Sequence, residues 1–229
     1  MNRVNSGIGN GGFAPLNMGA ADASRQPQNP SAPIVAFDFD GTLTARDSFK
    51  AFLAWHAGPL AYAAGWVGLA PAVLAYLRDR DRGRLKAAAA RVFLAGLSRN
   101  DIEALAASFV EANWDRLLRP DALQVWNRWR ERGARRVIVT ASPEILVAPF
   151  ARRLGADRLI GTRLSFDAQG RLDGALVGEN CRGPEKVRRL REAFGEDLRL
   201  AAAYGDSDGD REMLQIADER GYRVFKGRP

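Results

Sequence analysis

Two carboxylates follow the first apolar segment of the chain. Asp38 and Asp40 come directly after residues 34–37 and are followed by Gly41 and Thr42. A short apolar segment that ends in turn residues is typical of a buried strand that delivers its last side chains into a loop. Two like charges this close raise each other's pKa unless a cation or hydrogen-bond donors are present. The pair therefore indicates a metal-assisted nucleophile with a neighbouring acid, an arrangement used in phosphoryl transfer.

Polar residues also follow later apolar segments. Thr140 ends a β-branched segment, and Asp206 and Asp210 follow another. The carboxyl ends of parallel strands line one crevice of an open sheet, so we expect these side chains to meet Asp38 there. Lys186 begins a helix-like segment between the two and is expected to point into the same crevice.

Helix and strand patterns alternate after residue 119, which predicts an α/β fold with a doubly wound, mostly parallel sheet. Ser142 and Pro143 are expected to cap and begin one of its helices. The Ala-rich segment after the first motif predicts a helical cap domain inserted after the first strand. The expected divisions are a disordered N-terminal tail without a secretion signal, residues 1–33; a core, residues 34–46 and 119–229; and a helical cap, residues 47–118.

The composition limits the compartment and the partners. Cys181 is the only cysteine, which excludes an intramolecular disulfide and a zinc cluster built on thiolates, and fits a reducing, cytoplasmic location. The formal net charge of +7 favours anionic partners, namely nucleic acid, acidic lipid headgroups or a phosphorylated substrate.

Residues 51–77 contain no Asp, Glu, Lys or Arg. This stretch is longer than the roughly 20 residues needed to cross a bilayer. Pro59 and Pro71 disfavour one straight spanning helix, and a crossing would separate the acidic loop from the later motifs. Two interpretations stay open: buried helices of the cap, or a hydrophobic hairpin that dips into a membrane surface. The basic segment 78–86 and nearby Trp and Tyr residues suit the second interpretation.

The motifs together resemble those of the haloacid dehalogenase (HAD) superfamily of phosphohydrolases. In order and approximate spacing, the four elements are Asp38-x-Asp40-Gly41-Thr42, Thr140, Lys186 and Gly205-Asp206-Ser-x-x-Asp210. The helical insertion directly after the first motif is similar to subfamily IB, the phosphoserine-phosphatase-like subgroup. The resemblance covers about residues 34–226 and implies the HAD Rossmann-like fold.

The resemblance also implies catalytic roles. Asp38 is expected to be the nucleophile that forms an aspartyl-phosphate, and Asp40 the acid that protonates the leaving oxygen and later activates water. Mg²⁺ is the implied cofactor, held by Asp38, the Asp40 carbonyl and Asp206, with Asp210 in support of these ligands.

Phosphate binding is implied for a further set of groups. The hydroxyl of Thr140 and the ammonium of Lys186 are expected to hold phosphate oxygens, where charge lies in the transition state. Backbone N–H groups near Gly41 and Ala141 are expected to add hydrogen bonds.

Departures from the phosphoserine phosphatases bear on the substrate. Asp47 stands where those enzymes typically have a glutamate that reads the substrate's amine, and the cap is far more apolar. The cap, Thr140-Ala-Ser142-Pro143 and Cys181-x-Gly183-x-Glu185-Lys186 are more similar to phosphatidylglycerophosphatases of the C type.

We therefore expect a lipid phosphate substrate and peripheral contact with an anionic membrane at its cytoplasmic face. The alternatives are the same chemistry on a soluble phosphorylated metabolite, and a non-catalytic regulator or nucleic-acid binder with this fold. The intact set of Asp38, Asp40, Lys186 and Asp206 argues against the last.

Overall fold

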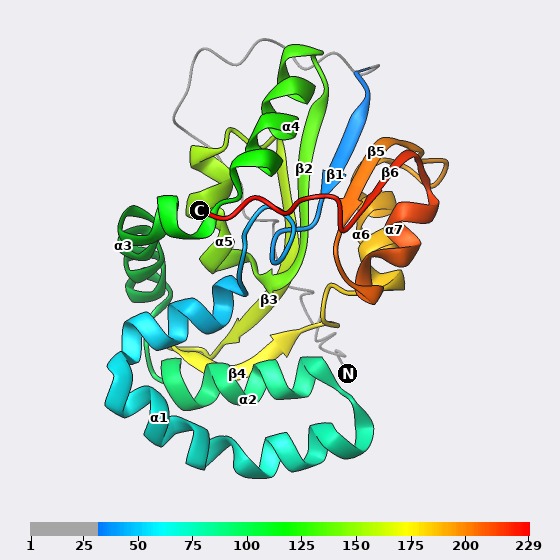
Figure 1. The fold of residues 1–229 in the computed structure, drawn as a ribbon. Coiled ribbons are helices and arrows are strands. Elements are labelled where there is room, and N and C mark those ends of the chain that lie inside the picture. Colours follow the sequence, from blue (N-terminus) through cyan, green and yellow to red (C-terminus); the bar gives the residue numbers. More distant parts are fainter. Residues whose placement is uncertain (1–31) are drawn as a thin grey trace, which may run out of the picture. The chain divides into compact units, whose positions relative to one another are not determined.

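The structure, a computed structural model, describes residues 32–229, which form one compact unit (Figure 1). Residues 1–31 of the predicted tail lie outside the described residues. The predicted division of the rest into core and cap remains a prediction.

A six-stranded sheet in the described part of the chain has the order β4-β3-β2-β1-β5-β6. The first strand is central and pairs in parallel with β2 and β5, while β3 and β4 are antiparallel. Its residues Val35, Ala36 and Phe37 are buried, which explains the continuous apolar segment before the carboxylates. The predicted doubly wound, mostly parallel fold is confirmed. The strands are β1 (Ile34–Phe37), β2 (Arg135–Pro143), β3 (Arg158–Phe166), β4 (Leu172–Val177), β5 (Leu200–Gly205) and β6 (Ala217–Tyr222).

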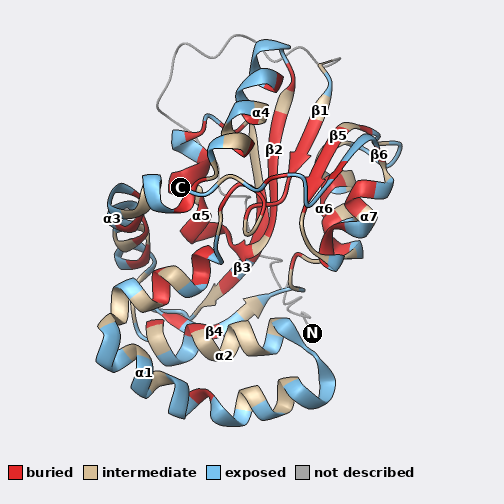
Figure 2. Cartoon of the chain, viewed as in Figure 1, coloured by how far each residue is buried: buried red, intermediate tan, exposed pale blue. Residues whose placement is uncertain are grey.

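Helices α1 to α3 stand between β1 and β2 in the sequence, so the predicted helical insertion after the first strand is confirmed. Buried residues concentrate in the sheet and on the helix faces turned toward it, whereas much of α1 is exposed (Figure 2). The helices are α1 (Ser48–Asp79), α2 (Arg82–Leu94), α3 (Arg99–Leu117), α4 (Pro120–Glu131), α5 (Glu144–Arg153), α6 (Pro184–Phe194) and α7 (Arg211–Gln215), with a 3-10 turn at Asp208–Asp210.

Helix α1 is divided by a kink at Gly58, whose φ of 73° and ψ of 167° are not helical. Pro59 follows directly, and a Gly-Pro pair is a typical cause of such a kink. The first limb, residues 48–57, packs on α3 through Phe52 and Phe109, whose ring centroids are 5.5 Å apart. The second limb, residues 59–79, lies against α2 and is mostly exposed. The interpretation of buried cap helices therefore holds for the first limb only.

Candidate active site

All the predicted site residues line one cavity of about 500 Å³ between the carboxyl edge of the sheet and the helical insertion. The strands β1, β2 and β5 end at this edge, as expected for parallel strands. The residues so assembled are Asp38, Asp40, Gly41, Asp47, Thr140, Ala141, Lys186, Asp206 and Asp210.

Lys186 lies at the centre of the polar cluster. Its ammonium donates hydrogen bonds to Asp38 Oδ1 at 2.6 Å, Asp210 Oδ1 at 2.7 Å and the carbonyl oxygen of Val139 at 2.7 Å. The side chain is 2% exposed, and its three N–H groups have three acceptors. Burial disfavours its charge, but Asp38 and Asp210 outweigh this effect and raise the pKa of Lys186. The lysine therefore stays an ammonium beside Asp38.

Asp210 fixes both this lysine and the loop after β5. Its second oxygen accepts from the backbone N–H groups of Asp206 and Ser207 and from the Ser207 hydroxyl. Burial opposes ionisation, but the Lys186 ammonium outweighs it and lowers the pKa of Asp210. Because both oxygens are engaged, Asp210 is suited to the supporting role that the sequence predicts for it.

The carboxylates of Asp38, Asp206 and Asp210 place oxygens within 4.8 Å of one another. Burial raises the pKa of Asp38 to about 8, with Lys186 opposing, and burial with Asp210 raises the pKa of Asp206. A divalent cation would relieve both effects, and oxygen ligands are those that Mg²⁺ prefers. The donor set therefore fits the predicted metal.

Gly41 lets the Asp206 carboxylate lie against the acidic loop. Its φ is +81°, and a Cβ at this position would stand 2.3 Å from Asp206 Oδ2. Both the backbone conformation and the close approach require glycine.

Asp40 is held by two hydrogen bonds. Its Oδ1 accepts from the Ser48 N–H at 2.7 Å, and its Oδ2 accepts from the Ser142 hydroxyl at 2.5 Å. Burial and then Asp47 raise the pKa of Asp40, which suits a group that donates a proton. The expectation that Ser142 and Pro143 cap and begin a helix is wrong: β2 runs to Pro143 and α5 begins at Glu144 without a side-chain cap. The Ser142 hydroxyl orients Asp40 instead.

Thr140 and Ala141 continue the same edge. The buried Thr140 hydroxyl accepts from the Ser142 N–H at 3.0 Å. The Ala141 carbonyl accepts from the hydroxyl of Thr162 and from the ammonium of Lys86.

Asp47 begins α1 as its N-cap, because its Oδ1 accepts from the Lys50 N–H at 2.9 Å. It is exposed at the rim of the cavity, and its part in specificity remains a prediction.

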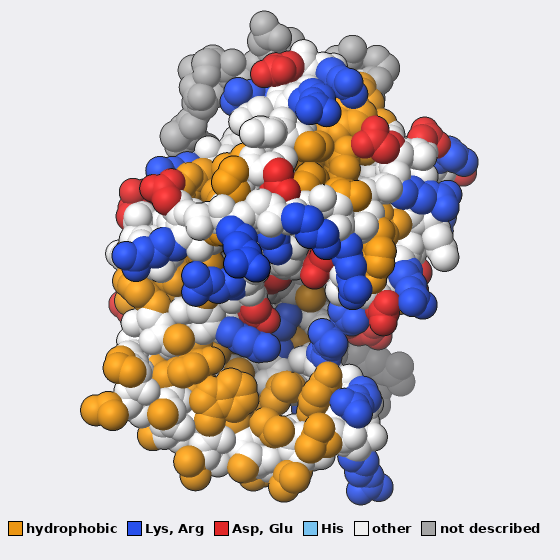
Figure 3. Space-filling view, in the orientation of Figure 1, with side chains coloured by type: hydrophobic (Ala, Val, Ile, Leu, Met, Phe, Trp, Pro, Cys, Tyr) orange, Lys and Arg blue, Asp and Glu red, His pale blue; other side chains and the backbone are white. Residues whose placement is uncertain are grey.

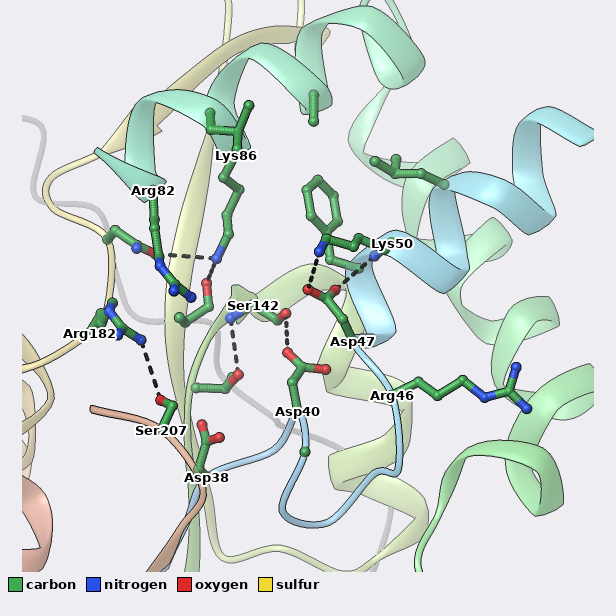
Figure 4. Close-up of a pocket in the computed structure, with 18 of the residues that line it drawn as sticks. Asp38, Asp40, Arg46, Asp47, Lys50, Arg82, Lys86, Ser142, Arg182 and Ser207 are labelled. Carbon is green, nitrogen blue, oxygen red and sulfur yellow. Dashed lines mark hydrogen bonds and ion pairs between the residues drawn. The ribbon is translucent and has the colours of Figure 1, made fainter. Parts of the chain in front are cut away.

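Three cations, two of them from the insertion, form a cationic wall of the cavity that sequence reasoning missed. Lys86 and Arg82 reach from α2, and Arg182 reaches from the loop before α6, toward the space above Asp38 and Asp40, whereas Arg46 points away (Figure 4). Lys86 also donates to Asn180, and burial lowers the pKa of Lys86 to about 8. For Arg82 and Lys86 the only sequence signal was the basic segment 78–86, which is the usual pattern of a solvated surface.

The opposite part of the cavity is apolar. Its side chains come from the second limb of α1 and from α2, and they are Tyr62, Trp66, Leu69, Tyr76, Leu85, Ala89 and Phe93. The cavity thus continues from buried carboxylates to aromatic and aliphatic groups of the insertion.

A comparison with protein families identifies the chain. The model of the haloacid dehalogenase-like hydrolases matches residues 35–215. This protein belongs to that family. The matched range includes every residue assembled at the sheet edge.

Several relatives of this haloacid dehalogenase-like hydrolase are known. It is 61% identical to Protein CicA of Caulobacter vibrioides over 196 residues, which cover 86% of this chain and 88% of the relative. It is 31% identical to phosphoserine phosphatase SerB1 of Mycobacterium tuberculosis over 228 residues, which cover 88% of this chain and 68% of the relative.

Solved structures share the fold. A protein of unknown function from Bordetella pertussis has a TM-score of 0.69 at 24% identity, covering 82% of this chain and 88% of that one. A phosphoserine phosphatase in its apo form has a TM-score of 0.55 at 19% identity, covering 84% and 86%. The prediction of a HAD-family phosphatase resembling the phosphoserine phosphatases is confirmed at the level of family and fold.

Proposed function

We propose that this hydrolase is a Mg²⁺-dependent phosphomonoesterase that acts through an aspartyl-phosphate on Asp38. The observation that supports it is the contact of Asp38 with a buried ammonium, 2.6 Å away, beside two further carboxylates at the same sheet edge. An ordinary structural role needs no such concentration of buried charge, because charges are rarely buried without a function or a partner.

The proposed reaction has two displacements. Lys186 holds one oxygen of Asp38, and the other oxygen attacks phosphorus while the bond from phosphorus to the leaving oxygen breaks. Asp40 protonates the leaving oxygen. Asp40 then takes a proton from a water molecule, whose oxygen attacks phosphorus and releases phosphate from Asp38. Thr140 and Lys186, with N–H groups near Gly41 and Ala141, are proposed to stabilise the charge on the phosphate oxygens.

The metal is proposed to bind Asp38, the Asp40 carbonyl and Asp206. When bound, Mg²⁺ neutralises negative charge and so lets an anionic ester approach an anionic nucleophile.

We further propose that the substrate is a lipid phosphate such as phosphatidylglycerophosphate, met at the cytoplasmic face of a membrane. The cavity supports this because its apolar part, with Tyr62 and Phe93, adjoins the catalytic carboxylates. Its cationic wall of Arg82, Lys86 and Arg182 is suited to a second anionic group of the same molecule.

A soluble phosphorylated metabolite is the second candidate. It is favoured by the relative named phosphoserine phosphatase and by the polar rim at Asp47, which is suited to read a small charged substrate. A non-catalytic regulator or a nucleic-acid binder is disfavoured, because neither needs the assembled carboxylates and Lys186.

The test is phosphate release from a panel of phosphomonoesters, comprising phosphatidylglycerophosphate in mixed micelles, phosphoserine and an aryl phosphate. We expect Mg²⁺-dependent release that a chelator abolishes, with the highest kcat/KM for the lipid. A higher kcat/KM for phosphoserine would select the second candidate. Absence of release from every ester with Mg²⁺ present would overturn the phosphatase proposal.

A further inference from the structure

The second limb of α1, residues 59–79, exposes apolar side chains along its outer face. Leu60 is 87% exposed, Val67 77%, Leu74 68% and Leu77 56%. These positions recur at helical spacing, together with the exposed Ala63, Ala64, Ala70 and Pro71. A helix on the surface of a soluble domain normally turns charged and polar residues to solvent. In this limb no charged side chain precedes Arg78.

The inner face of the same limb is also apolar but is engaged. Leu69 is 2% exposed, and Tyr62 packs on Phe93 of α2 with ring centroids 5.4 Å apart. The outer residues are therefore surplus to the packing of the insertion. A contiguous exposed apolar surface of this kind marks a binding site for an apolar partner.

The limb is not placed to cross a membrane as part of a straight helix. Although α1 is long and apolar enough by length and composition, Gly58 kinks it, and the first limb is anchored by the buried Phe49 and Phe52. At its other end α2 begins at Arg82 and packs on β4. Both ends thus return to the same folded unit, so the limb can lie on a surface without separating the motifs.

Cations flank the apolar surface. Exposed Arg78 lies in the last turn of the limb, and the exposed arginines Arg80, Arg82 and Arg84 follow it; two aspartates, Asp79 and Asp81, lie among them. Figure 3 shows hydrophobic side chains gathered over α1, with Lys and Arg side chains beside them and around the hollow between insertion and sheet. An apolar helix face bordered by an excess of cations is complementary to an anionic lipid surface, where each cation contributes about 1 kcal/mol.

We propose that the second limb of α1 docks on an anionic bilayer, with its axis in the plane of the interface and its outer side chains among the acyl chains. Tyr62 and Leu69 on the inner face line the catalytic cavity, so the docked limb would lie between the bilayer and the site. The passage of a lipid substrate from the bilayer past this limb to the site rests on the proposed function. The docking of the limb on the bilayer does not depend on that function.

The experiment is flotation of the protein with vesicles of phosphatidylcholine, with and without phosphatidylglycerol. The variant is Leu60→Asp with Val67→Asp, since both side chains are exposed and neither lines the cavity. The matched control is Ala104→Asp with Ala107→Asp, which adds the same charge to exposed positions of α3. Mg²⁺-dependent hydrolysis of a soluble aryl phosphate reports on folding and on the site for each protein.

We expect the wild type and the α3 control to float with the anionic vesicles, and the α1 variant to bind at least about tenfold more weakly. Hydrolysis of the aryl phosphate should be equal in all three. Failure of the wild type to float, or equal flotation of the α1 variant, would overturn the proposal. The proposal would also be overturned if light scattering showed that the wild type is a dimer and the α1 variant a monomer. A second copy of the chain would then cover the limb. Normal flotation without hydrolysis would instead count against the proposed function alone.

Discussion

The carboxyl edge of the sheet buries charged side chains, whereas the second limb of α1 exposes apolar ones. At the edge, charges are buried and matched, as in the contacts of Lys186 with Asp38 and Asp210. On the limb, Leu60 and Val67 stand in solvent without a partner in the described part of the chain. Buried charges are stable only with their counterions, and exposed apolar surfaces are stabilised by a partner. The edge therefore matches Asp210 and part of the charge of Asp38 within the chain and leaves Asp206 for the proposed cation, whereas the limb leaves its apolar side chains for the proposed bilayer.

Helix α3 shows that the exposure is a property of the limb and not of the whole insertion. Its N-terminus has a capping box formed by Ser98 and Asp101, and its inner face buries Ile102 and Phe109. Its outer face carries residues such as Glu111. A helix of the same insertion thus turns charged side chains to solvent, which makes it a suitable reference for the limb.

The nucleophile gives the largest expected effect. Asp38→Asn keeps the shape of the side chain but removes the carboxylate that is proposed to attack phosphorus. We expect kcat for an aryl phosphate to fall by at least about 10³-fold. Circular dichroism should show an unchanged fold. Activity at the wild-type level would contradict the assignment of Asp38.

Lys186→Met removes the buried positive charge at the edge and should lower both the activity and the stability of the protein. It leaves Asp38 and Asp210 buried without their counterion, which costs about 3–5 kcal/mol in comparable buried pairs. Urea unfolding measures the loss, and phosphate release should fall in parallel. Lys226→Met, at an exposed position, should change stability by less than about 0.5 kcal/mol. Equal stability of the two variants would show that the edge does not depend on this pairing.

Gly41→Ala tests the close approach of the acidic loop to Asp206. A methyl group would meet the carboxylate at 2.3 Å. We expect the Mg²⁺ concentration for half-maximal activity to rise by about 10–100-fold, the range seen when groups that orient metal ligands are altered. Gly96→Ala is the matched control, because its φ is +80° and nothing lies within 4 Å of the added atom. An equal effect of both variants would assign the change to backbone strain.

The sequence predicted the edge far better than the insertion. Asp38, Thr140 and Asp206 end apolar segments, and the topology of parallel strands then brings such ends together. The prediction for Ser142 is wrong because a Ser-Pro pair is a common helix start, whereas here the β2 strand continues through Ser142 to Pro143.

No comparable rule predicts the contacts of the insertion from its sequence. Lys86 reaches the Ala141 carbonyl 55 residues away, and no local pattern encodes that contact. The sequence left the exposure of the α1 limb open between two interpretations, because an apolar segment has the same pattern whether its outer face is buried or not.

Lys86 gives the smallest expected effect and lies where the edge and the insertion meet. Burial lowers its pKa to about 8, although Asp40 and Asp47 favour its charge. Below pH 8 the ammonium would attract the second anionic group of the proposed lipid substrate, and this attraction should be lost as the pH rises through about 8. The wild-type KM for an anionic lipid phosphate should therefore rise a few-fold across this range, and Lys86→Met should have a high KM that lacks this step.

An aryl phosphate, which has no second anionic group, is the control substrate, and its KM should show no such step that depends on Lys86. Stability supplies an independent readout. The folded protein holds fewer protons than the unfolded chain between pH 8 and the ordinary lysine value of 10.5, so the wild type should gain stability relative to Lys86→Met as the pH rises across that window. A stability difference that is flat from pH 8 to 10.5 would mean that burial does not lower the pKa of Lys86, and its charge would then persist across the pH range in which the KM is expected to rise.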